Sequence, residues 1–111
     1  RNIFMIKEKN MYKPLPESLT IKQSGINGLG LFADQDIKQA TNLGMSHMKM
    51  KETIFRTPLG GFINHANVPN CAKVELLMKD DSQDYKKWNL VTLQDIEKGE
   101  ELTVRYTFYN I

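Results

Sequence analysis

The chain has 111 residues, of which 41% are hydrophobic and 25% are charged, and its formal net charge is +2. This length is typical of a single domain with its own core. The mild charge comes without the basic stripe of nucleic-acid-binding proteins, so we expect no direct nucleic-acid partner. No apolar run approaches the roughly 20 residues of a membrane span and no signal peptide is visible, so we also expect no membrane partner.

Cysteine and histidine are scarce. The only cysteine, Cys71, excludes an internal disulfide and fits a reducing compartment, so we expect an intracellular protein that is not secreted. A structural zinc site requires about four Cys or His ligands, and only Cys71, His47 and His65 are present. The sequence therefore predicts no metal site.

The first half of the chain begins with a polar, irregular segment. Residues 1–17 contain two prolines and are expected to form an N-terminal extension, with one domain following over residues 18–111. Apolar residues alternate with polar ones over residues 18–24, which predicts a strand. Three glycines over residues 25–30 mark a turn and a close approach of the backbone to another group, and residues 52–57 are a second expected strand.

The second half shows clearer strand patterns. Period-two alternation predicts strands over residues 72–78 and 88–93, joined as a long hairpin by the polar residues between them. A turn at Gly99 precedes a last strand over residues 102–106, which is rich in β-branched residues. No segment keeps a helical apolar period for more than about two turns. We therefore expect a mainly β domain of short strands with little helix.

Three further stretches carry unusual residue combinations: "INGLGLFA" at 26–33, "FINHANVPNC" at 62–71 and "DIEKGEELTVRYTFY" at 95–109. Each has an ordinary structural explanation when taken alone. The Gly-x-Gly pair can form a simple turn, the Asn-His pair can be a hydrogen-bonded structural feature, and the last stretch can be a hairpin turn followed by a core strand.

Taken together, in this order, the three stretches resemble the motifs of the SET-domain protein lysine methyltransferases. The matching residues are Gly28-Leu29-Gly30-Leu31-Phe32-Ala33, Asn64-His65-Ala66 with Pro69-Asn70, and Gly99-Glu100-Glu101-Leu102-Thr103 with Tyr106. The resemblance runs from about Ser18 to Tyr109. The short chain looks most like the minimal SET proteins of viruses and microbes, which would place it in the cytoplasm or a host nucleus.

The resemblance implies a SET-domain fold of short β-clip-like sheets, with a C-terminal pseudoknot, and S-adenosyl-L-methionine as the cofactor. The backbone of Asn27, Gly28, Leu29 and Gly30, with Asn64 and His65, would bind that cofactor, and Tyr106 would be the catalytic tyrosine. The stretch before Asn64 would be a buried strand, in which Gly60 and Gly61 let the backbone pass through a crowded point.

The implied reaction is methyl transfer to a lysine of a protein or peptide substrate. Free lysine has a pKa of about 10.4, so an apolar channel that disfavours the ammonium would help the reaction. Val104, Phe108 and Tyr109 are the candidate lining of this channel. Phe108 and Tyr109 have an alternative explanation as a C-terminal hydrophobic plug.

The chain also departs from the family pattern. Ala66 replaces the usual serine, Asn67 replaces the commonest cysteine, and the Cys-rich tail that binds zinc and closes the channel is missing. These departures keep open a non-catalytic SET-like module that binds cofactor or peptide, and an exposed C-terminal patch that would favour a homodimer. Outside the motifs, His47 would lie near the substrate-facing segment, although a lone histidine is more often simply exposed, and that is what we expect. We expect Trp88 to lie in the core.

Overall fold

The computed structural model describes residues 15–79 and 84–106. Most of the expected N-terminal extension, and Phe108 and Tyr109, lie outside the described residues, so the division at residue 18 stays a prediction. The strands are β1 Leu19–Gln23, β2 Leu29–Ala33, β3 Asn42–Met50, β4 Thr53–Arg56, β5 Asn64–His65, β6 Cys71–Met78, β7 Tyr85–Thr92 and β8 Glu101–Val104, and the helix is α2 Pro58–Phe62. The prediction of a mainly β fold with little helix is confirmed.

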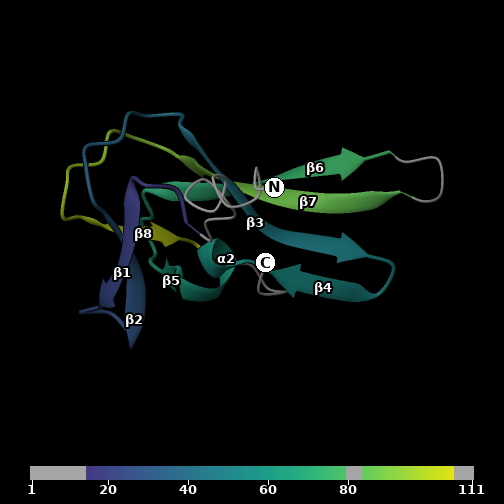
Figure 1. The fold of residues 1–111 in the computed structure, drawn as a ribbon, viewed down its shortest axis with the longest axis horizontal. Helices are drawn as coiled ribbons and strands as arrows, with labels where there is room; N and C mark the ends of the chain where they lie inside the picture. Colours follow the sequence, from purple (N-terminus) through teal and green to yellow (C-terminus); the bar gives the residue numbers. More distant parts are fainter. Residues whose placement is uncertain (1–14, 80–83, 107–111) are drawn as a thin grey trace, which may run out of the picture.

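The strands form two sheets at opposite ends of the molecule (Figure 1). One, called here the short sheet, has the order β1-β2-β8-β5, and the other, the long sheet, has the order β4-β3-β7-β6. Helix α2 contacts β2 in the short sheet and both β3 and β4 in the long sheet. It therefore joins the two halves of the fold.

The last described strand lies inside the short sheet rather than at its edge. Strand β8 pairs antiparallel with β2, at Leu31 with Leu102, and parallel with β5, at Asn64 with Thr103. The C-terminal segment is thus enclosed between two earlier parts of the chain. This insertion is the arrangement that the predicted pseudoknot requires.

The core lies where the two sheets meet. It is formed by aliphatic side chains that are almost fully buried, above all Leu31, Leu90, Ile96, Leu102 and Val104. An isolated bridge between Ile37 and Ile96 closes it at one end. Strand β8 contributes two of these side chains, so burial of apolar surface holds the enclosed strand in place.

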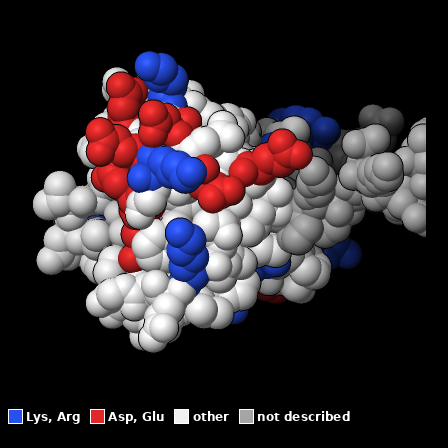
Figure 2. Space-filling view, turned by 60° about the vertical axis from the view of Figure 1, so that its left-hand side comes forward, with Lys and Arg blue, Asp and Glu red and all other residues white. Residues whose placement is uncertain are grey.

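On the face shown in Figure 2, acidic side chains with a few basic ones among them gather in the upper part, while the lower part is mostly uncharged and carries only scattered charges. The turns 34–41 and 93–100, at the upper left of Figure 1, are tied together by acidic side chains. Asp95 accepts a hydrogen bond from the Gln39 backbone (2.8 Å), and Asp36 accepts one from the Lys98 backbone (2.9 Å).

No helix in the described part of the chain has the length and apolar character needed to cross a membrane.

The longest strand, β3, was not predicted from the sequence. Its apolar alternation is broken by two irregularities in its pairing with β7, one between Asn42 and Gly44 and one between Met45 and His47. Gly44 has a φ of +119°, and its amide donates to the Asn42 side chain (2.9 Å). Each irregularity shifts the side-chain alternation, so the period-two signal is lost.

The segment before Asn64 also differs from its prediction. It forms helix α2 instead of a buried strand, because Pro58 fits the first helical turn. The crowded passage is confirmed for Gly60, where a Cβ would collide with the Ser46 carbonyl oxygen and lie 2.7 Å from a His47 ring carbon. The prediction of crowding is wrong for Gly61, where a Cβ would have no atom within 4 Å.

Candidate functional site

The parallel pairing of β5 with β8 brings the second and third motifs together. The Tyr106 hydroxyl donates to the carbonyl of Ile63 (2.7 Å), the residue before Asn64. The Tyr106 backbone N–H donates to Nδ1 of His65 (2.9 Å). Residues more than 40 positions apart in the sequence therefore meet at this seam between β5 and β8.

The Asn64 side chain is the centre of a hydrogen-bond cluster that we call the Asn64 network. Its two amide hydrogens are shared among the carbonyls of Asn27 (3.1 Å) and Leu29 (3.2 Å), the Ser24 hydroxyl (3.1 Å) and a Glu101 carboxylate oxygen (2.9 Å). The Ser24 hydroxyl in turn donates to the same carboxylate (2.8 Å). Side chains from β5 and β8 thereby fix the loop that carries the first motif.

Two glycines in this loop leave its backbone without side-chain cover. Gly28 has a φ of +49°, which favours glycine, and a Cβ on it would have open space around it. A Cβ on Gly30 would collide with a Glu101 carboxylate oxygen and lie 3.0 Å from the Asn64 amide nitrogen. Ile26 and Leu29 are about half exposed beside the bare backbone. Exposed backbone next to an apolar surface and a fixed amide suits a ligand with both a polar and an aromatic part.

His65 connects the Asn64 side of the seam to Tyr106. Because the Tyr106 N–H donates to Nδ1, the proton of the neutral ring resides on Nε2, which donates to the Asn67 side chain (3.1 Å). The His65 and Tyr106 rings lie 5.3 Å apart between centroids, tilted by 56°. The Tyr106 backbone therefore fixes the His65 tautomer, and Asn67, the residue that departs from the commonest family pattern, accepts the remaining ring proton.

Tyr106 also lines a cavity of about 260 Å³, which we call the Tyr106 cavity. It is lined by His47, Arg56, Gly60, Gly61, Ile63, Lys73 and Tyr106. The Lys73 ammonium lies 5.8 Å from the centroid of the Tyr106 ring. Burial lowers the pKa of Lys73. A basic amine with weakened proton affinity therefore lies beside the predicted catalytic tyrosine.

His47 is buried, with 2% of its surface exposed, so its predicted exposure is wrong. It lies in β3, which was missed, and its ring packs against Gly60. Burial, followed by the nearby charges of Lys73 and Arg56, lowers the pKa of His47 to about 4. The Ser46 hydroxyl donates to the Trp88 carbonyl (3.2 Å), so the neutral His47 ring donates from Nδ1 to Ser46 (3.0 Å).

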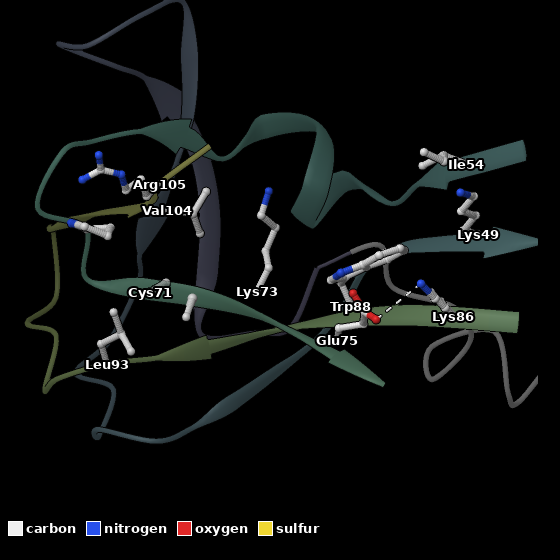
Figure 3. Close-up of a pocket in the computed structure, with 12 residues that line it drawn as sticks. Lys49, Ile54, Cys71, Lys73, Glu75, Lys86, Trp88, Leu93, Val104 and Arg105 are labelled. Carbon is white, nitrogen blue, oxygen red and sulfur yellow. Dashed lines mark ion pairs between the residues drawn. The ribbon is translucent and has the colours of Figure 1, made fainter. Parts of the chain in front are cut away.

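A larger groove of about 710 Å³ adjoins the Tyr106 cavity and shares Lys73 with it (Figure 3). Its lining includes Val104, Trp88, Leu93 and Cys71. Val104 was predicted to line the substrate channel, and it lies at the wall of this groove while being 1% exposed. Burial raises the pKa of the Cys71 thiol to about 12, so this cysteine is not a nucleophile at neutral pH.

The predicted cofactor residues thus lie in β5 and in the loop bound to Asn64, and one of them, His65, contacts Tyr106. Trp88 is buried as predicted, at the edge of the groove rather than in the aliphatic cluster. Among the described residues, no three His, Cys, Asp or Glu side chains come together as metal ligands would.

Asn70 and Glu101 belong to the second and third motifs, but the sequence indicated no role for them. The Asn70 side chain donates to the Glu101 carbonyl (2.9 Å) and accepts from the Thr103 amide (2.8 Å), so it holds β8 as a neighbouring strand would. Ser24 and Lys73 were missed altogether. Nothing in the local sequence sets them apart, because their partners lie more than 30 residues away.

Comparison with known proteins places the second and third motifs in a family. The family model for the SET domain matches residues 45–107, which is more than half of the chain. A crystal structure of a Plasmodium falciparum protein named as a proposed histone methyltransferase has the same fold, with a TM-score of 0.64 at 16% sequence identity. The alignment covers 84% of this chain and 96% of that one. No curated protein sequence matches. The chain belongs to the SET-domain family.

Proposed function

We propose that the chain transfers a methyl group from S-adenosyl-L-methionine to the side-chain amine of a protein lysine. The observation that supports this most is the seam between β5 and β8. There Tyr106 is bonded to the residue before Asn64, and the Asn64 amide is bonded to the glycine loop. The cofactor would then bind at the glycine loop, close to the tyrosine that would position the acceptor amine.

The residues present fit the cofactor. The backbone of Asn27, Gly28, Leu29 and Gly30 would hold it together with Asn64 and His65, and when bound it supplies a methyl group on a positively charged sulfur. The Asn64 network holds the glycine loop in place before any ligand arrives, which lowers the ordering cost of binding.

Tyr106 would position the acceptor amine. Its hydroxyl hydrogen is committed to the Ile63 carbonyl, so its oxygen can accept a hydrogen bond from an amine in the Tyr106 cavity. An amine at its ordinary pKa of about 10.4 is neutral in roughly one molecule in two thousand at pH 7. The lowered pKa of Lys73 supports a cavity that disfavours ammonium, and such a cavity increases the nucleophilic fraction of any amine inside it.

The experiment that tests this function is incubation with methyl-labelled S-adenosyl-L-methionine, a mixed cell lysate and histones, followed by mass spectrometry. We expect label on lysine side chains, and calorimetry should detect cofactor binding. Cofactor binding without transfer to any lysine, the chain's own included, would instead indicate a non-catalytic SET-like module.

Self-association of the chain is a separate proposal. The C-terminal aromatic residues on which the homodimer prediction depends lie outside the described residues. Light scattering over a range of protein concentrations tests it, and a strict monomer at high concentration would contradict it.

A further inference from the structure

Lys73 is the one lysine among the described residues that line the Tyr106 cavity. It extends from β6 between Val104 and Trp88 in Figure 3, and it lines both the Tyr106 cavity and the adjoining groove. Its Nζ lies 5.8 Å from the centroid of the Tyr106 ring. A target lysine in the proposed reaction would have to bring its amine to this same tyrosine.

The charges around the cavity oppose entry of a further cation. Arg56 and Lys73 both line it, and no Asp or Glu is among the described residues that form its wall. Two like charges 4 Å apart repel by about 1 kcal/mol in water and by about 4 kcal/mol where the effective dielectric constant is near 20. An external lysine would enter as an ammonium against this repulsion, whereas Lys73 is already inside.

We propose that Lys73 is a methyl acceptor of the chain itself; this rests on the proposed function. The amine first loses its proton to solvent. Its lone pair then forms a C–N bond to the methyl carbon while the C–S bond of S-adenosyl-L-methionine breaks. The bonding electron pair stays on sulfur, S-adenosylhomocysteine leaves as a neutral thioether, and Lys73 becomes a methylammonium.

The state of the Lys73 amine agrees with this assignment. Burial lowers its pKa, so a larger fraction is neutral near pH 7 than for an exposed lysine. The methylated product keeps its positive charge and can keep its contact with the Tyr106 ring. The modification would therefore be compatible with the fold.

Lys22 offers a matched internal control. Its Nζ lies 5.9 Å from the Phe32 ring centroid, which is nearly the same contact, but the Phe32 ring has no hydroxyl and Lys22 lies in neither cavity. If contact with an aromatic ring were sufficient for modification, Lys22 and Lys73 would be labelled alike.

The first experiment incubates the purified chain with methyl-labelled S-adenosyl-L-methionine and no other protein, and maps the label by tandem mass spectrometry. We expect Lys73 to be labelled at least about tenfold faster than Lys22, because Lys73 lines the Tyr106 cavity and Lys22 lies in neither cavity. For transfer within one molecule, the fraction labelled per unit time should not change with protein concentration. The Lys73→Arg variant keeps the positive charge and should lose this label.

A second experiment needs no cofactor. Reductive methylation with ¹³C-formaldehyde places NMR-visible methyl groups on every lysine. We expect the Lys73 signal to be displaced by the Tyr106 ring current and to titrate below the ordinary range of a lysine pKa. Replacing Tyr106 by leucine should remove the displacement. A Lys73 signal that coincides with those of exposed lysines would overturn the placement of this amine.

The outcomes separate the two proposals. Label on histone or lysate lysines with none on Lys73 would overturn this inference and leave the proposed function standing. Cofactor binding with no labelled lysine in any protein would overturn both. Equal label on Lys73 and Lys22, or label that persists elsewhere at the same total in Lys73→Arg, would indicate unselective methylation and would also overturn the inference.

Discussion

In the long sheet, β6 and β7 pair over eight consecutive positions, whereas in the short sheet β8 pairs with β2 and with β5 over two positions each. The long sheet is therefore held mainly by its backbone ladder. In the short sheet, the side-chain amides of Asn64 and Asn70 replace much of that ladder. The large groove runs along the long sheet, whereas the short sheet leaves the backbone of a glycine loop exposed around a fixed amide.

The joint between the two sheets should be the most sensitive point. Replacing Gly60 with alanine places a Cβ against the Ser46 carbonyl and the His47 ring, where backbone has to move. We expect a loss of about 2–4 kcal/mol in the free energy of unfolding, measured by urea denaturation. Gly61→Ala is the matched control in the same helix, and because its Cβ meets open space it should be neutral or slightly stabilising. Equal effects of the two variants would contradict this account of the joint.

The same joint should make stability depend on pH through His47. Its pKa is about 4 in the folded chain and about 6.5 in the unfolded chain, so between these values the unfolded state binds the extra proton. This contribution is fully present above pH 6.5 and is lost as the pH falls toward 4, by up to about 3 kcal/mol. Urea titrations at several pH values measure it.

The control for this pH dependence is His47→Asn, which can still donate a hydrogen bond toward Ser46 but does not titrate. Its stability should fall less steeply between pH 6.5 and 4 than that of the original chain. Parallel curves for the two proteins would assign the pH dependence to other groups.

Asn70 tests whether side chains hold β8. Asn70→Ala removes the acceptor of the Thr103 amide and the donor to the Glu101 carbonyl, so we expect a loss of about 2 kcal/mol. Asn67→Ala, which removes an exposed contact to His65, should cost less than about 1 kcal/mol. Similar values for both variants would mean that β8 is held by its apolar burial alone.

The smallest effect is expected in the long sheet. Glu75 and Lys86 form an ion pair of 3.6 Å between β6 and β7, with both side chains about half exposed. Because exposed ion pairs are screened by water, Glu75→Ala should change stability by less than about 0.5 kcal/mol. A loss above 1 kcal/mol would show that the long sheet also depends on its side chains.

The sequence predicted those parts of the fold in which the local pattern is regular. The strands over β1, β4, β6 and β8 and the long hairpin follow from alternation and turn residues. Strand β3 was missed because its irregular pairing destroys the alternation. Helix α2 was missed because its five residues are too few to show a helical period, and two of them are glycines.

The residues of the candidate site also fall into those that the sequence predicted and those that it did not. Asn64, His65 and Tyr106 belong to motifs that a resemblance can find, and their meeting at the seam agrees with it. Lys73 and His47 have no motif, and their environment is set by residues far away in the chain. Burial and pKa follow from tertiary contacts, which local sequence patterns do not contain.

The central claim is that Asn64 serves cofactor binding whereas Tyr106 serves methyl transfer. Calorimetric titration with S-adenosyl-L-methionine, carried out on Asn64→Ala and Tyr106→Phe in parallel with methyl-transfer assays, tests it most directly. We predict weakened cofactor binding for Asn64→Ala. For Tyr106→Phe we predict near-normal binding with methyl transfer reduced by one to three orders of magnitude, about 1.4 kcal/mol per factor of ten. Normal methyl transfer by Tyr106→Phe, or unchanged cofactor affinity of Asn64→Ala, would contradict the account.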